Sequence, residues 1–332
     1  MAQINDLFAQ LWQGLLPALR VIGSESFLYS VLRLSTPILL ATMAVLVSDR
    51  AGVTNISIEG SMLFAALMGV VGSAYTGSAW LGLVAAILSG MGFALLLSLF
   101  HLKLKTNLIL TCIALNSLSS GLTVFILYLL TGDRGVSTAL RSVDLPKVEL
   151  PLIRDIPFVG AVLSGQNALT YIAILTVVAV AVLLYHTKLG AYIRAVGENP
   201  QAVETSGRSA RKIRFIALII SGAIAGMGGA FMSMAYVSGF TKDMVSGRGF
   251  IALAAEAMGR GHPLWSALSS LLFGFADSLA NNLQVLGIPS DIARMFPYVL
   301  TVAALSLYAA RGRAGRKLAR TRRVSGGSLQ RS

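Results

Sequence analysis

The stretch FLYSVLRLSTPILLATMAVLVS, residues 27–48, decides the class of fold. It carries a single charged side chain, Arg33, and it is long enough to cross the apolar core of a bilayer as a helix, which takes about 20 residues. Further, mostly apolar runs follow it along the chain. The sequence therefore predicts about nine membrane spans (eight to ten), at 27–48, 60–77, 80–100, 107–131, 168–186, 214–237, 244–259, 264–285 and 297–311.

The composition supports the same class of protein. The chain has 332 residues, of which 55% are hydrophobic and 12% are charged. An ordinary soluble domain is about 25% charged, so this chain has too few charges to cover a soluble surface. Its single cysteine, Cys112, excludes an internal disulfide. We expect an all-α, polytopic integral membrane bundle that forms one transmembrane domain over residues 1–332.

The positive charges indicate how the chain is oriented. The loops at 49–59, 101–106, 187–213 and 260–263, together with the basic tail at 312–332, hold 18 Lys and Arg residues if those at the span edges are included, against 8 on the other side. Because cytoplasmic loops of membrane proteins are enriched in Lys and Arg, we expect these loops and the C-terminus in the cytoplasm. The excess of Lys and Arg in cytoplasmic loops then explains the net charge of +13 without a nucleic acid as partner. The side of the N-terminus depends on the short span at 244–259.

Two polar stretches interrupt the apolar runs, DRAGVTNISIEG at 49–60 and EAMGRGHP at 256–263. Each is either a plain surface loop or a broken helix, and non-helical backbone survives at membrane depth only inside protein or beside a wet cavity. Polar side chains in such a bundle turn inward, to bond a neighbouring helix or to line a substrate pathway. We expect Asn55 and Glu59, with Asn116 and Asn282 facing them, to contribute to that pathway.

Four ionisable side chains fall within or at the edges of spans: Arg33, Glu59, Glu256 and Asp277. A charge at the bilayer centre costs roughly 2.5–3.5 kcal/mol on insertion scales. We therefore expect each of the four to face the bundle interior and to have a partner. A structural ion pair and a role in transport both remain open for each.

The loop TKLGAYIRAVGENPQAVETSGRSARKI, residues 187–213, differs from the other loops. It predicts one short helix at 190–196, ended by Gly197. A second starts with Pro200 in its first turn, with Asn199 as cap, and is ended by Gly207. Two short amphipathic helices with exposed alanines and glutamates suit a docking surface for a cytoplasmic partner better than a lipid-facing element.

Four segments of the chain resemble a known family of permeases. GAYIRAVGENPQAVETSG (190–207) resembles the cytoplasmic coupling loop of ABC-importer permeases of the branched-chain amino acid, ribose and nucleoside class. GVTNISIEGSMLFAAL (52–67) resembles the segment after the first core helix of that family. ALAAEAMGRGHPLWSALSSLLFGFADSL (252–279) and MFPYVLTVAALSL (295–307) resemble its nucleoside and simple-sugar branch. Arg208, Ala257 and Met258 depart from the family pattern, and the match covers residues 30–311.

The resemblance implies a permease subunit of an ATP-driven importer in the bacterial inner membrane. It implies an alternating-access transporter of a small molecule, with nucleosides first, simple sugars second and branched-chain amino acids third. It also implies three partners: an ABC ATPase, a second permease subunit and an extracytoplasmic substrate-binding protein. The residues expected to couple to the ATPase are Gly190, Arg194, Ala195, Gly197, Glu198, Asn199, Pro200, Ala202, Glu204 and Gly207.

The chain has no GxxxxGK[ST] phosphate loop, so we expect ATP hydrolysis in a separate subunit, and neither a catalytic residue nor a cofactor nor a metal here. Membrane lipid surrounds the spans. Two other classes of protein remain as alternatives. One is a secondary transporter that uses Glu256 or Asp277 as a proton relay, and the other is a membrane receptor or scaffold.

Overall fold

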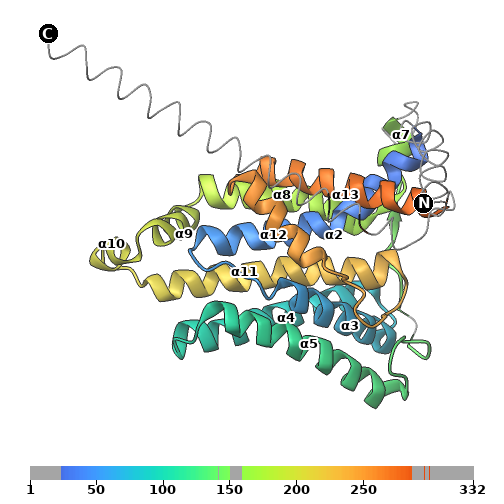
Figure 1. Ribbon diagram of the computed structural model, residues 1–332, viewed down its shortest axis with the longest axis horizontal. Coiled ribbons are helices and arrows are strands. Elements are labelled where there is room, and N and C mark those ends of the chain that lie inside the picture. Colours follow the sequence, from blue (N-terminus) through green and yellow to red (C-terminus); the bar gives the residue numbers. More distant parts are fainter. Residues whose placement is uncertain (1–23, 141, 150–158, 286–294, 296–298, 300–332) are drawn as a thin grey trace, which may run out of the picture.

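The computed structural model describes residues 24–140, 142–149, 159–285, 295 and 299. This part of the chain is a bundle of helices with one short antiparallel pair of strands (Figure 1). The elements are α2 (Glu25–Arg50), α3 (Ile58–Thr76), α4 (Ala79–Ser98), the π-helix η1 (Leu99–Lys103), α5 (Leu108–Thr131), β1 (Lys147–Val148), α7 (Val159–Leu163), β2 (Gln166–Asn167), α8 (Ala168–His186), α9 (Lys188–Glu198), α10 (Pro200–Thr205), α11 (Ala210–Phe231), the π-helix η2 (Met232–Tyr236), α12 (Arg248–Gly259) and α13 (Pro263–Val285).

Six helices in the described residues are long and apolar enough to cross a membrane, and each falls on a predicted span. They are α2, α3, α4 with η1, α5, α8 and α11 with η2. Helix α13 coincides with the span predicted at 264–285, and its 23 residues reach about 34 Å at 1.5 Å per residue. The span predicted at 297–311 and the basic tail lie outside the described residues.

The structure has a shorter helix than the span predicted at 244–259. Helix α12 has only 12 residues, about 18 Å in length, whereas the apolar core of a bilayer is about 30 Å thick. The backbone before it is non-helical, since Asp243, Ser246 and Gly247 all have positive φ. Thr241 pairs with Val136 at the far end of α5. A turn-rich segment and a helix of 12 residues therefore stand where the sequence predicts one continuous helix.

The two ends of the bundle collect different loops (Figure 1). At the end that carries α9 and α10, Arg50 Nε donates to the carbonyl of Gly261 at 2.8 Å, and Arg214 Nε donates to the carbonyl of Ala51 at 3.2 Å. At the opposite end the Tyr29 hydroxyl donates to the carbonyl of Gly165 at 2.9 Å. The loops predicted to share a side, as far as they are described, therefore meet at one end.

Helix α2 lies at the centre of the bundle and packs against α8, α11, α12 and α13. Its side chains Leu40, Met43 and Leu46 are fully buried. Helix α5, in contrast, presents Ile113, Phe125 and other large apolar side chains to the outside. This gradient positions the polar residues of α2 and its neighbours inside the protein and leaves α5 at the outside of the bundle.

Candidate functional site

Asn55 lies in the non-helical segment that joins α2 to α3, and its side chain is fully buried. Its amide oxygen accepts from the backbone N–H and the hydroxyl of Ser57, at 3.1 and 2.7 Å. Its amide nitrogen donates to the hydroxyl of Ser221 on α11 at 3.3 Å. In this conformation Asn55 ties the segment to α11, and a place beside the substrate pathway stays a prediction.

Asn116 on α5 holds the same segment from the other side. Its amide oxygen accepts from the backbone N–H of Gly60 at 2.8 Å, and its amide nitrogen donates to the carbonyl of Ile56 at 3.2 Å. The hydroxyl of Ser119 donates to the carbonyl of Gly60 at 2.6 Å. The structure thus brings Asn116 to the 49–60 stretch through bonds that fix the start of α3, and its part in a substrate pathway stays a prediction.

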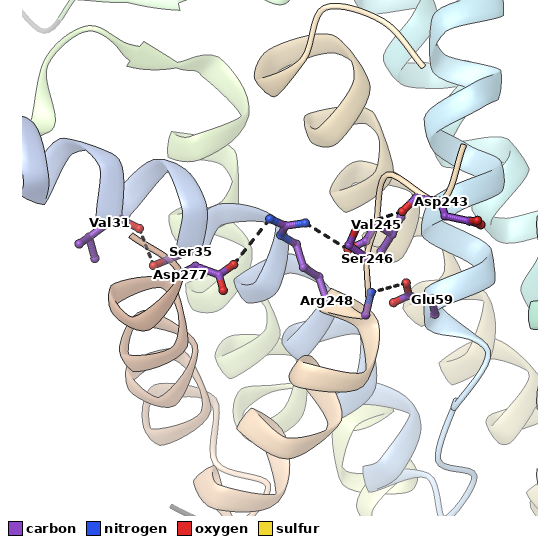
Figure 2. A network of polar contacts seen from close by, with 9 residues as sticks. Val31, Ser35, Glu59, Asp243, Val245, Ser246, Arg248 and Asp277 are labelled. Atoms are coloured by element: carbon purple, nitrogen blue, oxygen red, sulfur yellow. Dashed lines mark hydrogen bonds and ion pairs between the residues drawn. The ribbon is translucent and has the colours of Figure 1, made fainter. Parts of the chain in front are cut away.

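Glu59 caps the start of a distant helix, α12 (Figure 2). Its two carboxylate oxygens accept from the backbone N–H groups of Gly247 and Gly249, each at 2.7 Å. The first N–H groups of a helix have no partner within it, and the positive end of the helix dipole favours a carboxylate. A Cβ on Gly249 would lie 2.7 Å from the backbone nitrogen of Glu59, so glycine is required for this approach.

A second contact ties the first residue of α12 to α13 (Figure 2). The guanidinium of Arg248 lies 3.6 Å from the carboxylate of Asp277, with the two side chains 16% and 13% exposed. Arg248 also donates to the carbonyl of Val245 at 3.2 Å. Arg248 was not among the candidates from sequence, although an arginine beside Gly247 and next to an apolar run was the available signal.

The expectation that each ionisable group has a partner holds for three of the four groups. Glu59 and Asp277 have the contacts above, and Arg33 donates to the carbonyl of Tyr236 at 3.1 Å. Glu256 is buried near Asp49 and Arg50, but within the described part of the chain no hydrogen bond or ion pair reaches its carboxylate.

A cavity of about 240 Å³ opens between the start of α2 and the end of α13. The Arg33 guanidinium lies over the ring of Tyr236, 5.0 Å from its centroid. Asn282 donates to the carbonyl of Ser278 at 2.8 Å and lines the cavity with Asn281. A guanidinium, an aromatic ring, amides and hydroxyls can together bind a planar ring and a hydroxylated sugar.

Asn282 therefore does not face Asn55, Glu59 and Asn116, which gather around the start of α3. It lies toward the end of the bundle opposite to α9 and α10. Tyr236 is not recognisable from sequence as part of the cavity, because it lies at the end of an apolar run and only the fold brings it under Arg33.

The loop at 187–213 forms two helices near the predicted bounds, α9 and α10. The Thr187 hydroxyl accepts from the N–H of Gly190 at 3.0 Å. The Asn199 side chain accepts from the N–H of Ala202 at 3.1 Å and caps α10, whose first residue is Pro200. Gly207, with φ 80°, follows the end of α10. Local caps set the starts of both helices, but α9 continues through Gly197, which was predicted to end it, as far as Glu198.

The predicted coupling residues divide into two groups. An exposed face holds Ala195, Glu198, Asn199, Ala202, Glu204 and Gly207. The others pack the two helices onto the bundle: Gly190 is buried against α8, and Arg194 lies over the ring of Tyr185, 5.0 Å from its centroid. Gly197 rests on the carbonyl of Arg50, the last residue of α2. Pro200 is half-buried.

Comparisons with known proteins agree with this architecture. The family model described as branched-chain amino acid transport system / permease component matches residues 27–305. The guanosine ABC transporter permease protein NupQ of Bacillus subtilis (strain 168) is 32% identical over 283 residues, which cover 82% of this chain and 88% of the relative. The nucleoside ABC transporter permease protein NupC of Lactococcus lactis subsp. cremoris is 31% identical over 301 residues, 87% and 92% of the two chains.

One solved structure shares the fold. It is an ABC transporter described as of metal-chelate type, in an inward-facing conformation. The superposition has a TM-score of 0.50 at 15% identity and covers 91% of this chain and 99% of the other. The likeness concerns the arrangement of helices alone.

Proposed function

The chain belongs to the family of branched-chain amino acid transport system permease components, and we propose that it is the permease subunit of an ABC importer whose cargo is a nucleoside. The observation that carries the choice of cargo is the identity of about a third with guanosine and nucleoside permeases along most of their length. The cavity beside Arg33 and Tyr236 supports it, because its groups suit a base and a ribose.

The exposed face of α9 and α10 is the surface on which we place a separate ATPase subunit. The end of the bundle with these helices is then cytoplasmic, as the excess of Lys and Arg indicates. A binding protein meets the opposite end, in the extracytoplasmic space of a bacterial inner membrane. A second permease subunit completes the transporter, and residues 1–332 act as one transmembrane domain.

The contacts around Arg50 suggest how ATPase movement reaches the bundle. Gly197 of α9 rests on Arg50 at the end of α2, and Arg50 bonds Gly261 in the turn between α12 and α13. A displacement of α9 therefore acts on three helices at once. Nucleotide binding by the ATPase would shift the equilibrium between inward- and outward-open states, and permease and ATPase affect each other reciprocally.

Uptake by the assembled transporter tests the proposal. The permease, its ATPase and its binding protein are reconstituted in proteoliposomes and offered labelled guanosine, uridine, glucose and leucine. We expect nucleoside uptake that requires ATP and persists when a protonophore collapses the proton gradient. Uptake of glucose or leucine alone would overturn the choice of cargo. Loss of uptake with the protonophore at constant ATP would indicate a secondary transporter.

The cavity is tested separately. Replacing Tyr236 by Leu removes the ring under Arg33, and we expect a rise in the KM for nucleoside of up to roughly tenfold, the scale of a cation–π or stacking contact. Tyr236→Phe keeps the ring and should transport almost normally. Tyr75→Leu, an exposed tyrosine outside the cavity, is the control. Equal uptake by the two Tyr236 variants would mean that the substrate pathway does not pass through this cavity.

The orientation is tested with cysteines in a Cys112→Ser background. An impermeant thiol reagent added to intact cells should label Val143→Cys and leave Glu204→Cys unlabelled; both positions are exposed. A cysteine near Ser325 in the tail should also stay unlabelled. Labelling of Glu204→Cys would place α10 outside and remove it from any ATPase.

A further inference from the structure

A larger cavity, of about 550 Å³, lies between the end of α4 with η1 and the first turn of α11. Three cationic side chains line it: Lys103, Arg211 and Lys212. Three apolar side chains line it as well, Leu95, Leu99 and Phe215, and they are 49%, 37% and 41% exposed. The cavity therefore has a charged part and an apolar part.

The two parts lie at different depths. Leu95 precedes Lys103 by eight residues in one continuous span, which corresponds to about 12 Å along the helix axis. Because this candidate span ends at Lys103, we expect the apolar wall to reach into the hydrocarbon region and the cations to stand where the helices leave it. A soluble protein docked on this end could meet the cations but could not fill the apolar wall.

These cations lack a counter-charge in the part of the chain that the structure describes. Within the described residues none of Lys103, Arg211 and Lys212 forms an ion pair, and the first turn of α11 holds no acidic residue. Arg211 and Lys212 moreover stand at the positive end of the α11 dipole, where cations are disfavoured. Three such charges around one cavity repel one another, and a bound anion would offset this repulsion.

We propose that this cavity binds an anionic phospholipid, with the phosphate among Lys103, Arg211 and Lys212 and an acyl chain along Leu95, Leu99 and Phe215. Basic pockets between transmembrane helices are suited to such headgroups. The separation of charge and apolar wall matches the amphipathic shape of a lipid. The site is distinct from the cavity at Arg33, which lies toward the other end of the bundle, and it does not depend on which cargo the permease carries.

Photocrosslinking tests the site in the full-length protein in nanodiscs. Phosphatidylglycerol and phosphatidylcholine probes with the same photoreactive acyl chain are compared, and labelled peptides are mapped by mass spectrometry. We expect the phosphatidylglycerol probe to label residues 95–103 and 209–215 and to be displaced by unlabelled phosphatidylglycerol but not by phosphatidylcholine. The variant Arg211→Gln/Lys212→Gln should lower affinity roughly fivefold per cation removed.

A matched variant, Lys105→Gln/Lys188→Gln, removes the same charge at the same end outside the cavity and should keep the labelling. Equal labelling by the two probes in the wild-type protein would overturn the proposal without any variant. Competition by inorganic phosphate as strong as that by phosphatidylglycerol would assign the cations to a soluble anion. Protection by the ATPase or by a second permease subunit would assign the cavity to a protein contact. Either result would overturn the lipid site.

Discussion

Helices α9 and α10, which form a hairpin, and helix α12 are all short and begin at a break in the chain. The residues that cap the hairpin helices are close in sequence, whereas the residue that caps α12 is distant. In the hairpin, Thr187 and Asn199 each accept an N–H three residues ahead. At α12 the cap is Glu59, which is 188 residues away in sequence from Gly247. The hairpin is therefore specified by local sequence, and α12 exists only because the bundle supplies its cap.

The largest effect that tests this difference is expected for Glu59→Ala. The substitution leaves the N–H groups of Gly247 and Gly249 without acceptors inside the protein. At about 1–3 kcal/mol for each of the two unsatisfied groups, the loss of stability should be roughly 2–6 kcal/mol. A thiol-reactive dye that reports exposure of the buried Cys112 on heating measures it.

Glu59→Gln retains one side-chain oxygen that can accept and should give an intermediate melting temperature. The control is Glu25→Ala, which removes an exposed carboxylate from the first turn of α2. If Glu59→Ala melts like this control, the α12 start does not depend on a distant cap, and the contrast with the hairpin fails.

The same difference explains what could be predicted from sequence. The hairpin was predicted to within about two residues, since an Asn-Pro start and a glycine stop act within one turn. The six long apolar runs were predicted as spans for the same reason, because length and hydropathy are local properties. The structure begins α12 at Arg248, four residues after the start of the span predicted at 244–259. The polar stretch SGRG at 246–249 interrupts the run that begins at Met244, but neither the positive φ of Ser246 nor the carboxylate of Glu59 is visible locally.

The candidate site was only partly predictable. Arg33 and Asn282 are candidates from the sequence because polar groups in apolar runs are costly. That these two residues share a cavity with Tyr236, while Asn55 and Asn116 bond other helices, follows from the packing of α2, α5 and α13. No spacing in the sequence encodes that arrangement.

A smaller effect is expected at the second distant contact of α12. Asp277→Ala leaves the charge of Arg248 without its carboxylate. Breaking a fully buried pair costs about 3–5 kcal/mol, but this pair is partly exposed and 3.6 Å apart, so we expect about 2 kcal/mol. Arg248→Met combined with Asp277→Ala should cost less than the sum of the single variants in the same melting assay. Additive losses would mean that the two charges do not interact.

Gly197 is the point where the hairpin does depend on the rest of the bundle. A Cβ there would strike the carbonyl of Arg50, and Gly197→Val should push α9 off the end of α2 at about 1–3 kcal/mol. We expect ATP hydrolysis to continue while nucleoside uptake per ATP falls. Gly92→Ala, where nothing lies within 4 Å, is the control for a glycine substitution. Unchanged uptake in Gly197→Val would make the hairpin a mere connector.

The smallest effect is expected for Asn199→Ala, which removes the cap of α10. Loss of an asparagine cap costs about 1 kcal/mol, and because α10 is exposed and short, this cost should appear as fraying of α10 alone. The amide of Ala202 should exchange with solvent roughly fivefold faster, which is what 1 kcal/mol corresponds to, while the melting reported by Cys112 stays unchanged.

Asn199→Asp keeps an acceptor at the cap and should restore slow exchange, and Gln201→Ala, at an exposed neighbour, should leave the Ala202 amide as it is. The decisive result is that amide exchange at Ala202 changes while the melting reported by Cys112 does not. A locally specified helix loses its own protection without weakening the bundle, whereas loss of the α12 cap weakens the bundle. If Asn199→Ala lowers the melting temperature as Glu59→Ala does, α10 is part of the cooperative core, and its local caps are not what holds it.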